Sequence, residues 1–216
     1  MKISRRLNFI INEIENNSIA DIGTDHAYVP IAAFLRGKIQ KAIATDIRQG
    51  PLDIAQKNIL SFSLQNFIQT RLSDGFKNIL PGEVKTGIIA GMGGLIICDI
   101  IGHENLSGID QLILQPQNNF YYVRKKLHCI GFKIVNEIFL YQQKFYNIIN
   151  ARRGHDIFYD EKDYAVGKIL LEQKNPLLKK FLALQIKKLS RIKKFNCDAQ
   201  KFYDLYLEVL HCFAHK

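Results

Sequence analysis

Residues 18–30 read SIADIGTDHAYVP, and this stretch decides the fold. A short apolar run broken by one acid, Asp21, is followed by Gly23 and the polar cluster Thr24-Asp25-His26. The pattern predicts a buried strand that ends in a glycine turn and leads into a helix. In open α/β sheets, ligands bind at the carboxyl ends of the strands, so we expect a nucleoside-containing cofactor at this corner.

The same alternation of strand and helix continues along the chain. Alternating strands and helices predict a parallel sheet with helices on both faces. A closing antiparallel hairpin, expected over 132–141 and 144–152, makes the sheet mixed and seven-stranded. This arrangement is typical of a class I methyltransferase, a Rossmann-like α/β fold. The other expected strands cover 19–23, 41–46, 67–72, 86–90 and 110–115, and the helices between them cover 27–36, 50–63, 95–101 and 119–129.

After residue 154 the pattern becomes purely helical. Apolar residues at helical spacing predict an amphipathic helix over 164–173 and two long helices over 177–195 and 199–213. The two long helices form a coiled-coil-like αα-hairpin. We therefore expect a cofactor-binding domain over residues 1–156 and a C-terminal helical hairpin domain over residues 157–216.

Composition limits the possible classes of protein. The 216 residues carry a net charge of +10, and residues 160–216 alone hold 12 lysines and arginines against 7 acids, which favours a polyanionic partner. No apolar run reaches the roughly 18 residues of a membrane span. Four widely separated cysteines lack metal-binding spacing and predict reduced thiols in the core. We expect a cytoplasmic monomer that uses no metal and no membrane.

Acids and glycines recur at the expected strand ends. Asp46 ends the second strand, about 20 residues beyond a nucleotide-binding turn, where an acid accepts ribose hydroxyls. Asp74 ends the third strand, where it would bond the adenine amine of a cofactor. The glycine-rich turn 91–94 leaves room beside a reacting group. Single acids at strand ends often cap helices, but three at successive strands favour a site.

The first corner also distinguishes between cofactors. The G-x-G-x-x-G fingerprint is absent, and Asp25 stands where its second glycine would lie. A carboxylate there would repel a pyrophosphate. S-adenosylmethionine carries no phosphate and has a cationic sulfur, so the sequence favours this cofactor.

Six motifs together resemble the TrmK family, the bacterial tRNA adenine-N1 methyltransferases that act on adenine 22. The opening ISRRL (Ile3–Leu7) is also similar to the start of that family, and the resemblance covers nearly the whole chain. The motifs are DIGTDHAYVPI (Asp21–Ile31), ATD with a following GP (Ala44–Pro51), RLSDGF (Arg71–Phe76), IAGMGG (Ile89–Gly94), LILQP (Leu112–Pro116) and KFYNIINARRG (Lys144–Gly154).

The resemblance implies an S-adenosylmethionine site, a tRNA substrate and transfer to a ring nitrogen. Three residues are candidates for the catalytic step: Asp25, Tyr28 and Met92. The expected cofactor-binding residues are Arg5, Asp21, Gly23, Asp25, His26, Asp46, Ile47, Asp74, Gly75, Gly91, Met92 and Gly93. The expected tRNA-binding residues are Gln115, Tyr146, Arg152, Arg153, Lys187, Lys188, Arg191 and Lys194, with the two arginines of β-hairpin residues 152–153 placed near the crevice.

The chemistry expected of an adenine-N1 transfer is simple. N1 has its own lone pair, so no base has to remove a proton, and a carboxylate such as Asp25 would stabilise the cationic product. Positioning should contribute most. N1 lies on the Watson–Crick edge, so the base must be unpaired or flipped out, with Tyr28 or Tyr146 as a stacking partner. Two other functions remain open: a small-molecule methyltransferase, and a non-catalytic RNA-binding protein.

Overall fold

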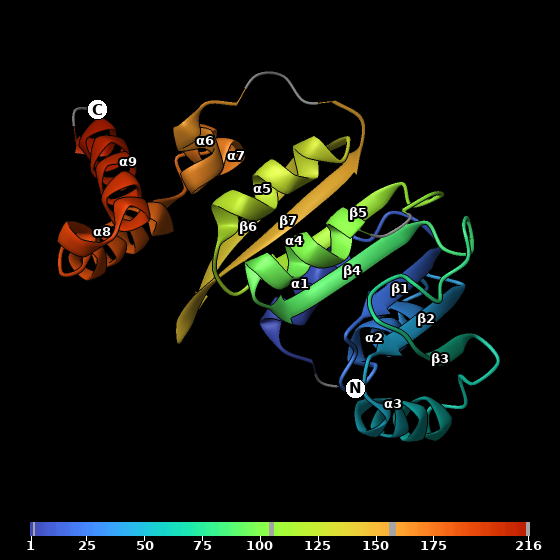
Figure 1. Ribbon diagram of the computed structural model, residues 1–216. Helices are drawn as coiled ribbons and strands as arrows, with labels where there is room; N and C mark the ends of the chain where they lie inside the picture. The colour runs from blue at the N-terminus through green and yellow to red at the C-terminus, as the bar shows by residue number, and fades with distance from the viewer. Residues whose placement is uncertain (2, 104–105, 156–158, 215–216) are drawn as a thin grey trace.

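The computed structural model describes residues 1, 3–103, 106–155 and 159–214, with the side chain of residue 214 left out. Its centre is one seven-stranded sheet in the order β3-β2-β1-β4-β5-β7-β6 (Figure 1). The predicted mixed sheet of a class I methyltransferase is confirmed. The strands are β1 (Ser18–Ile22), β2 (Lys41–Asp46), β3 (Ile68–Leu72), β4 (Thr86–Met92), β5 (Gln111–Pro116), β6 (Phe132–Gln142) and β7 (Lys144–Arg153).

Strand direction decides which residues meet at each edge. β1 to β5 are mutually parallel, so their carboxyl ends share one edge of the sheet. β7 runs antiparallel to β5, with Gln111 opposite Arg152 and Leu114 opposite Ile149. The start of β7 therefore lies toward the carboxyl ends of the parallel strands, and its end lies toward their amino ends.

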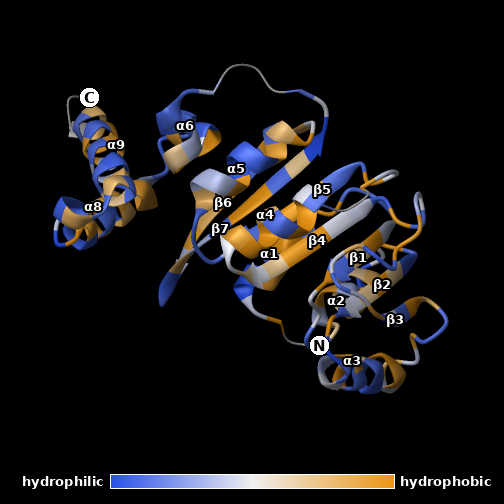
Figure 2. Cartoon of the chain, viewed as in Figure 1, coloured by the Kyte–Doolittle hydropathy of each residue, from blue (hydrophilic) through white to orange (hydrophobic). Residues whose placement is uncertain are grey.

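Helices cover both faces of the sheet (Figure 1). The helices α1 (Arg5–Asn12), α2 (Tyr28–Leu35) and α3 (Gln49–Ser61) bury apolar residues against one face. The helices α4 (Gly94–His103) and α5 (Phe120–Cys129) do so against the other. Neighbouring residues of β5 alternate between the two cores, with Leu112 in one and Ile113 in the other. Figure 2 shows the apolar character of β4 and the facing α4.

The single helix predicted over 164–173 is wrong, because the chain breaks it at Gly167. The structure has two short helices instead, α6 (Glu161–Val166) and α7 (Lys168–Glu172). Gly167 has φ +108°, and a Cβ there would lie 2.5 Å from Glu137 Oε2 and 2.9 Å from Arg124 Nη2. The buried Arg124–Glu137 pair, 2.9 Å between Nε and Oε1, thus occupies the space beside the turn.

The C-terminal helical hairpin is formed by α8 (Pro176–Leu189) and α9 (Cys197–Ala214). The first helix ends before the predicted residue 195, and a 3-10 turn, η1 (Lys193–Phe195), follows. Asn196 then caps α9, since its Oδ1 accepts the Ala199 N–H at 2.9 Å. The predicted domain boundary at 156–157 lies outside the described residues.

A separate cluster of apolar and charged contacts joins these helices to the β6 edge of the sheet. Phe139 of β6 packs with Phe181 of α8, and Val209 of α9 belongs to the same cluster. Glu161 lies 2.6 Å from Lys125 Nζ and 2.7 Å from Lys201 Nζ, and these hydrogen bonds lower its pKa to about 2. The helical hairpin is therefore fixed to the sheet by both packing and charge.

The expectation of four core thiols is wrong for three of them, because Cys129, Cys197 and Cys212 lie on exposed helix positions and only Cys98 is buried. Among the described residues, no helix is long and apolar enough to cross a membrane. In the same part of the chain, no group of three His, Cys, Asp or Glu side chains is placed to hold a metal ion.

Candidate active site

The corner after β1 is held by one side chain, Thr24. Its Oγ1 donates to Asp21 Oδ2 at 2.8 Å and accepts the Ala27 N–H at 3.2 Å, while its backbone N–H donates to Thr45 of β2 at 2.7 Å. Gly23 adopts φ +71°, and a Cβ at this position would lie 1.9 Å from Met92 Cε. The glycine thus makes room for Met92 from the end of β4, which brings the two predicted motifs into contact.

Asp21 is buried beneath this corner, and its surroundings change its pKa. Burial raises its pKa to about 6, although the hydrogen bond from Thr24 and the charge of Arg6 oppose the shift. The Arg6 guanidinium comes from α1, before the first strand. An ionised Asp21 therefore depends on two neighbours for its stability.

Asp25, His26 and Tyr28 lie at the mouth of this corner. The Asp25 side chain is 73% exposed, and its Oδ2 lies 3.2 Å from His26 Nε2. The His26 ring stacks on Tyr28 with centroids 4.9 Å apart and planes 13° apart. The three predicted residues form one continuous, solvent-facing unit.

The acids that end β2 and β3 differ in their surroundings. Asp46 is 8% exposed, and its Oδ1 accepts the Arg48 N–H at 2.8 Å. Ile47, which follows it, is exposed. Asp74 is exposed and pairs with Lys77 at 2.5 Å, beside Gly75 in a turn with φ +60°. Both acids stand at the carboxyl edge, as the sequence predicted.

The glycine turn after β4 is held by two side chains that the sequence analysis missed, Gln117 and Asn118. Gln117 donates its backbone N–H to the Met92 carbonyl at 2.9 Å and its side-chain amide to the Gly91 carbonyl. Asn118 Oδ1 accepts the Gly94 N–H at 3.0 Å. β4 extends through Met92 with an irregular register after Ala90, so Gly91 and Met92 belong to the strand. Gly93 follows directly.

Arg6, rather than the predicted Arg5, enters the site. Arg6 Nη1 donates to Gln115 Oε1 at 2.5 Å, and its guanidinium lies 5.6 Å from the Tyr146 ring centroid. Arg5 is exposed and lies over Phe9 instead. Helical spacing carried the missing signal, because Arg6 is one turn before the buried Ile10. Arg6 thereby links the predicted residues Gln115 and Tyr146 to the crevice.

The expectation that Arg152 and Arg153 lie near the crevice is wrong. They end β7 opposite the start of β5, roughly 17 Å along the strands from the carboxyl edge. Arg152 pairs with Glu15 at 2.6 Å. Arg153 donates to the carbonyls of Leu106 and Ile109 at 2.5 and 3.0 Å. The antiparallel direction of β7 puts both at the opposite edge.

The predicted tRNA-binding side chains of the helical hairpin lie together. Lys187 and Lys188 are exposed near the end of α8, and Arg191 and Lys194 are exposed in the turn that follows. Together they form a basic surface on the helical hairpin, and Figure 1 shows α8 and α9 beyond the β6 edge of the sheet.

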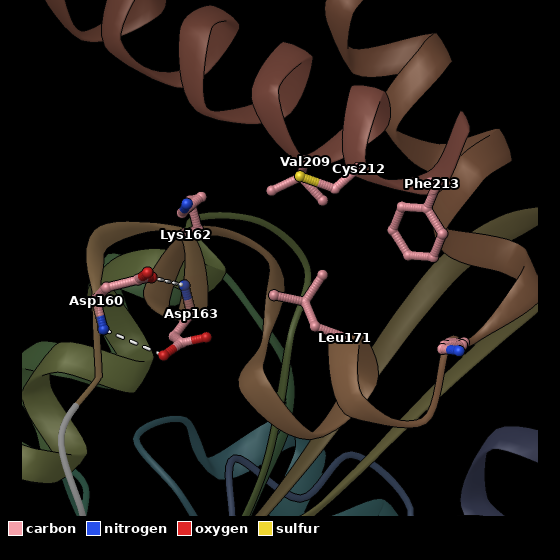
Figure 3. Close-up of a pocket in the computed structure, with 8 residues that line it drawn as sticks. Asp160, Lys162, Asp163, Leu171, Val209, Cys212 and Phe213 are labelled. Atoms are coloured by element: carbon pink, nitrogen blue, oxygen red, sulfur yellow. Dashed lines mark hydrogen bonds between the residues drawn. The ribbon is translucent and has the colours of Figure 1, made fainter. Parts of the chain in front are cut away.

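The structure has two hollows of different character, one at the carboxyl edge and one between the C-terminal helices. A crevice of about 170 Å³ is lined by Arg6, Asp21, Gly23, Asp25 and Tyr28, among others. A larger hollow of about 420 Å³ lies between α6, α7 and the end of α9 (Figure 3). Its acids, Asp160 and Asp163, form the capping box of α6 and are satisfied by each other's backbone N–H groups. In the first hollow, by contrast, the side chain of Asp25 is largely exposed.

The donor set of the carboxyl edge fits S-adenosylmethionine. Asp46 and Asp74 present carboxylates for ribose hydroxyls and an adenine amine, and Asp21 and Asp25 suit a cationic centre. At Gly91, Gly93 and Gly94 the turn after β4 offers backbone that carries no side chain. Among the described residues, these features meet along one edge of the sheet.

Comparison with known proteins agrees with this geometry. The family model of TrmK, tRNA (adenine(22)-N(1))-methyltransferase, matches residues 19–204. The chain is 35% identical over 189 residues to the tRNA (adenine(22)-N(1))-methyltransferase of Bacillus subtilis, a match that covers 83% of this chain and 79% of the relative.

Two solved structures extend the comparison to ligands. Sp1610 of Streptococcus pneumoniae, in complex with S-adenosyl-L-methionine, superposes with a TM-score of 0.89 at 32% identity, covering 97% of this chain and 100% of that one. TrmK of M. capricolum, in complex with S-adenosyl-homocysteine, gives a TM-score of 0.83 at 28% identity, covering 97% and 95%. The resemblance inferred from the sequence is confirmed, and the chain belongs to the TrmK family of tRNA (adenine(22)-N(1))-methyltransferases.

Proposed function

We propose that this protein transfers a methyl group from S-adenosylmethionine to N1 of adenine 22 in tRNA. The observation that carries the proposal is the row of carboxylates at the ends of β1, β2 and β3, next to the glycine turn of β4, in a member of the TrmK family. Related structures that hold S-adenosyl-L-methionine or S-adenosyl-homocysteine support the choice of cofactor.

Each part of the carboxyl edge has a role in cofactor binding. Asp46 accepts the ribose hydroxyls, and Ile47 covers the adenine ring beside it. Asp74, on the turn with Gly75, accepts the adenine amine. Asp21 and Gly23 shape the floor, Asp25 and His26 form the rim, and Arg6 takes the place that the sequence analysis gave to Arg5.

The chain contributes positioning and charge to the transfer step. S-adenosylmethionine supplies an electrophilic methyl group on a cationic sulfur. The backbone of Gly91, Met92 and Gly93, held by Gln117 and Asn118, places the acceptor nitrogen in line with that group. Asp25 stabilises the positive charge that develops on the adenine. No side chain has to remove a proton, because N1 attacks with its own lone pair.

The target base must leave its stack to reach this edge. Tyr28, 41% exposed and stacked on His26, presents a ring at the mouth of the crevice. Tyr146, between the cations of Arg6 and Lys144, presents a second ring near the end of β5. We assign stacking on the target adenine to one of these two tyrosines, with Gln115 as the residue that orients Arg6.

The basic surface of the helical hairpin serves tRNA binding. Four cations are exposed at the end of α8 and in the turn that follows it: Lys187, Lys188, Arg191 and Lys194. Neutralising phosphates releases counterions, so affinity for tRNA should fall steeply with salt. Arg152 and Arg153, at the opposite edge, would contact tRNA only if it reached around the sheet. We further propose that the protein works as a monomer in the cytoplasm. Sedimentation of the purified protein with tRNA should then show a one-to-one complex.

The direct test is transfer of a labelled methyl group. The protein is incubated with labelled S-adenosylmethionine and either an unmodified tRNA transcript or a panel of small metabolites. Label in the tRNA alone supports the proposal. Label in a metabolite would favour a small-molecule methyltransferase. If calorimetry detects no binding of S-adenosylmethionine to the protein, and Asp46→Ala causes no loss, a non-catalytic RNA-binding protein would be favoured.

A further inference from the structure

A groove of about 550 Å³ lies between the β6–β7 hairpin and the helical hairpin. Its walls carry aromatic rings from helices and strands: α5 and the β-hairpin supply Phe120, Tyr141 and Phe145, α8 supplies Phe181, and α9 supplies Phe202 and Tyr206. Gln143 and Gln185 add amides to the same walls. Neither the cofactor nor the transfer step assigned above uses this groove.

The aromatic rings form a ladder from the core to the opening. Phe139 is buried and stacks on Phe145 with centroids 5.4 Å apart and planes 13° apart. Phe145 in turn lies 4.9 Å from Tyr141. Tyr141 is 43% exposed, so the last ring of the ladder faces solvent at the groove. A large exposed ring backed by packed rings is a preformed stacking platform.

One end of the groove shares two residues with the glycine turn of the candidate active site. Gln117 and Asn118, which line the groove, are the residues that hold the glycine turn after β4. A ligand in the groove therefore lies directly beside a base presented to Gly91–Gly94.

The charge of the groove selects the class of ligand. Lys144 and Lys188 line it, and Lys180 Nζ lies 4.5 Å from the Tyr141 ring centroid. The described lining residues include no Asp or Glu. Stacking rings, amides that donate and accept, and cations without acids are together the set that recognises unpaired nucleotides of RNA.

We propose that this groove binds an unpaired nucleotide of tRNA that neighbours the target adenine. Its base stacks on Tyr141, its edge meets the amides of Gln143 and Gln185, and its phosphates lie between Lys144 and Lys188. The inference rests on the proposed function and deepens it, because the groove would hold the strand while the adjacent adenine reaches the crevice.

The first experiment compares Tyr141→Ala and Tyr141→Phe in methyl transfer to a tRNA transcript. Losing the stack should raise the KM for tRNA about tenfold. The kcat and the dissociation constant of S-adenosylmethionine should change less than about twofold, and Tyr141→Phe should restore the KM. Phe62→Ala is the matched control, because Phe62 is an exposed aromatic at the end of α3, outside the groove. An unchanged KM for Tyr141→Ala, or an equal rise in Phe62→Ala, would overturn the proposal.

A second experiment removes the base instead of the tyrosine. Transcripts that carry one abasic nucleotide at each unpaired position near the target are tested with the unaltered protein and with Tyr141→Ala. One position should raise the KM about tenfold for the unaltered protein and leave the KM of Tyr141→Ala unchanged, because both changes remove the same stack. Independent, additive effects at every position would overturn the groove assignment even if Tyr141→Ala binds tRNA poorly.

The two proposals fail in different ways. If the unaltered protein methylates no adenine in the transcript, the proposed function fails and the groove assignment fails with it. If the unaltered protein methylates the transcript and the Tyr141 variants and abasic transcripts behave additively, only the groove assignment fails.

Discussion

The two edges of the parallel strands are built in opposite ways. At the amino edge, polar side chains satisfy one another: Gln111 donates to the Glu13 carbonyl at 2.7 Å and to Asn150 Oδ1 at 3.0 Å. At the same edge, Arg153 donates hydrogen bonds to the backbone carbonyls of Leu106 and Ile109. At the carboxyl edge, Asp25 and Asp74 are exposed.

Two turns at the carboxyl edge also have an unusual backbone. Next to the carboxyl ends, two helices begin after non-glycine residues with φ +54°, Ala27 before α2 and Asn119 before α5. Positive φ costs such residues of order 1 kcal/mol or more, and it persists where the surroundings enforce it. Polar groups that are paired within the protein stabilise the fold, whereas exposed acids on strained turns are available to ligands. Variants at the two edges should therefore separate stability from activity.

The largest effect is expected for Asp46→Asn. The amide oxygen still accepts the Arg48 N–H, so the fold should persist, but the charged acceptor for the ribose hydroxyls is lost. Hydrogen bonds to a charged group are worth about 1.5–3 kcal/mol, so the dissociation constant of S-adenosylmethionine should rise about 100-fold in calorimetry. Asp110→Asn, at the amino edge beside Lys85, is the control and should bind normally. Equal losses in both variants would break the contrast.

Asp21→Asn should change the pH dependence of stability. The folded pKa of about 6 exceeds the unfolded value, so Asp21 stabilises the fold below about pH 4 and loses this contribution as pH rises through 6. The shift of about two units corresponds to about 3 kcal/mol. In urea unfolding without cofactor, the free energy of the variant relative to the original should rise by that amount between pH 4 and 7. A constant difference across this range would contradict the assignment.

Arg153→Met should act on stability alone. The change leaves the Leu106 and Ile109 carbonyls without their guanidinium donor, at a cost of about 2 kcal/mol in the free energy of unfolding. Denaturant titration measures this loss. Cofactor binding by the folded protein should not change, and a weaker affinity at constant stability would place Arg153 in the site after all.

The smallest effect is expected for the double change Lys187→Ala with Lys188→Ala. Two exposed cations contribute to tRNA affinity through phosphate contacts, so the dissociation constant should rise several-fold and the log–log salt slope should fall by about two. Lys57→Ala with Lys41→Ala, which changes two exposed cations on α3 and at the start of β2, removes the same charge and should leave the slope unchanged. If the two double variants have equal salt slopes, the helical hairpin does not contact tRNA phosphates through Lys187 and Lys188.

Local patterns predicted the parts of the molecule that local forces decide. An apolar run that ends at an acid predicts the β2 strand at 41–46, and the shared edge of parallel strands predicts that Asp21, Asp46 and Asp74 lie at one edge. The break at Gly167 was not predictable, since its cause is the buried pair Arg124–Glu137 from distant strands and helices.

The predicted positions of three site residues, Arg5, Arg152 and Arg153, are wrong for a related reason. Arg5 and Arg6 are adjacent in sequence, and only the packing of α1 against the sheet decides which one faces Gln115. Arg152 and Arg153 belong to a motif that resembles the family, yet the direction of β7 carries them to the amino edge. Contacts between elements far apart in the chain, rather than residue type, decided both outcomes.

Mapping the modified nucleotide shows whether the carboxyl edge methylates N1 of one adenine in tRNA. A tRNA transcript treated with the protein and S-adenosylmethionine is digested and analysed by mass spectrometry, with reverse-transcription stops giving the position. We expect 1-methyladenosine at position 22 alone, absent from the Asp46→Ala reaction. A methyl group on another atom or position, or equal product from Asp46→Ala, would contradict it.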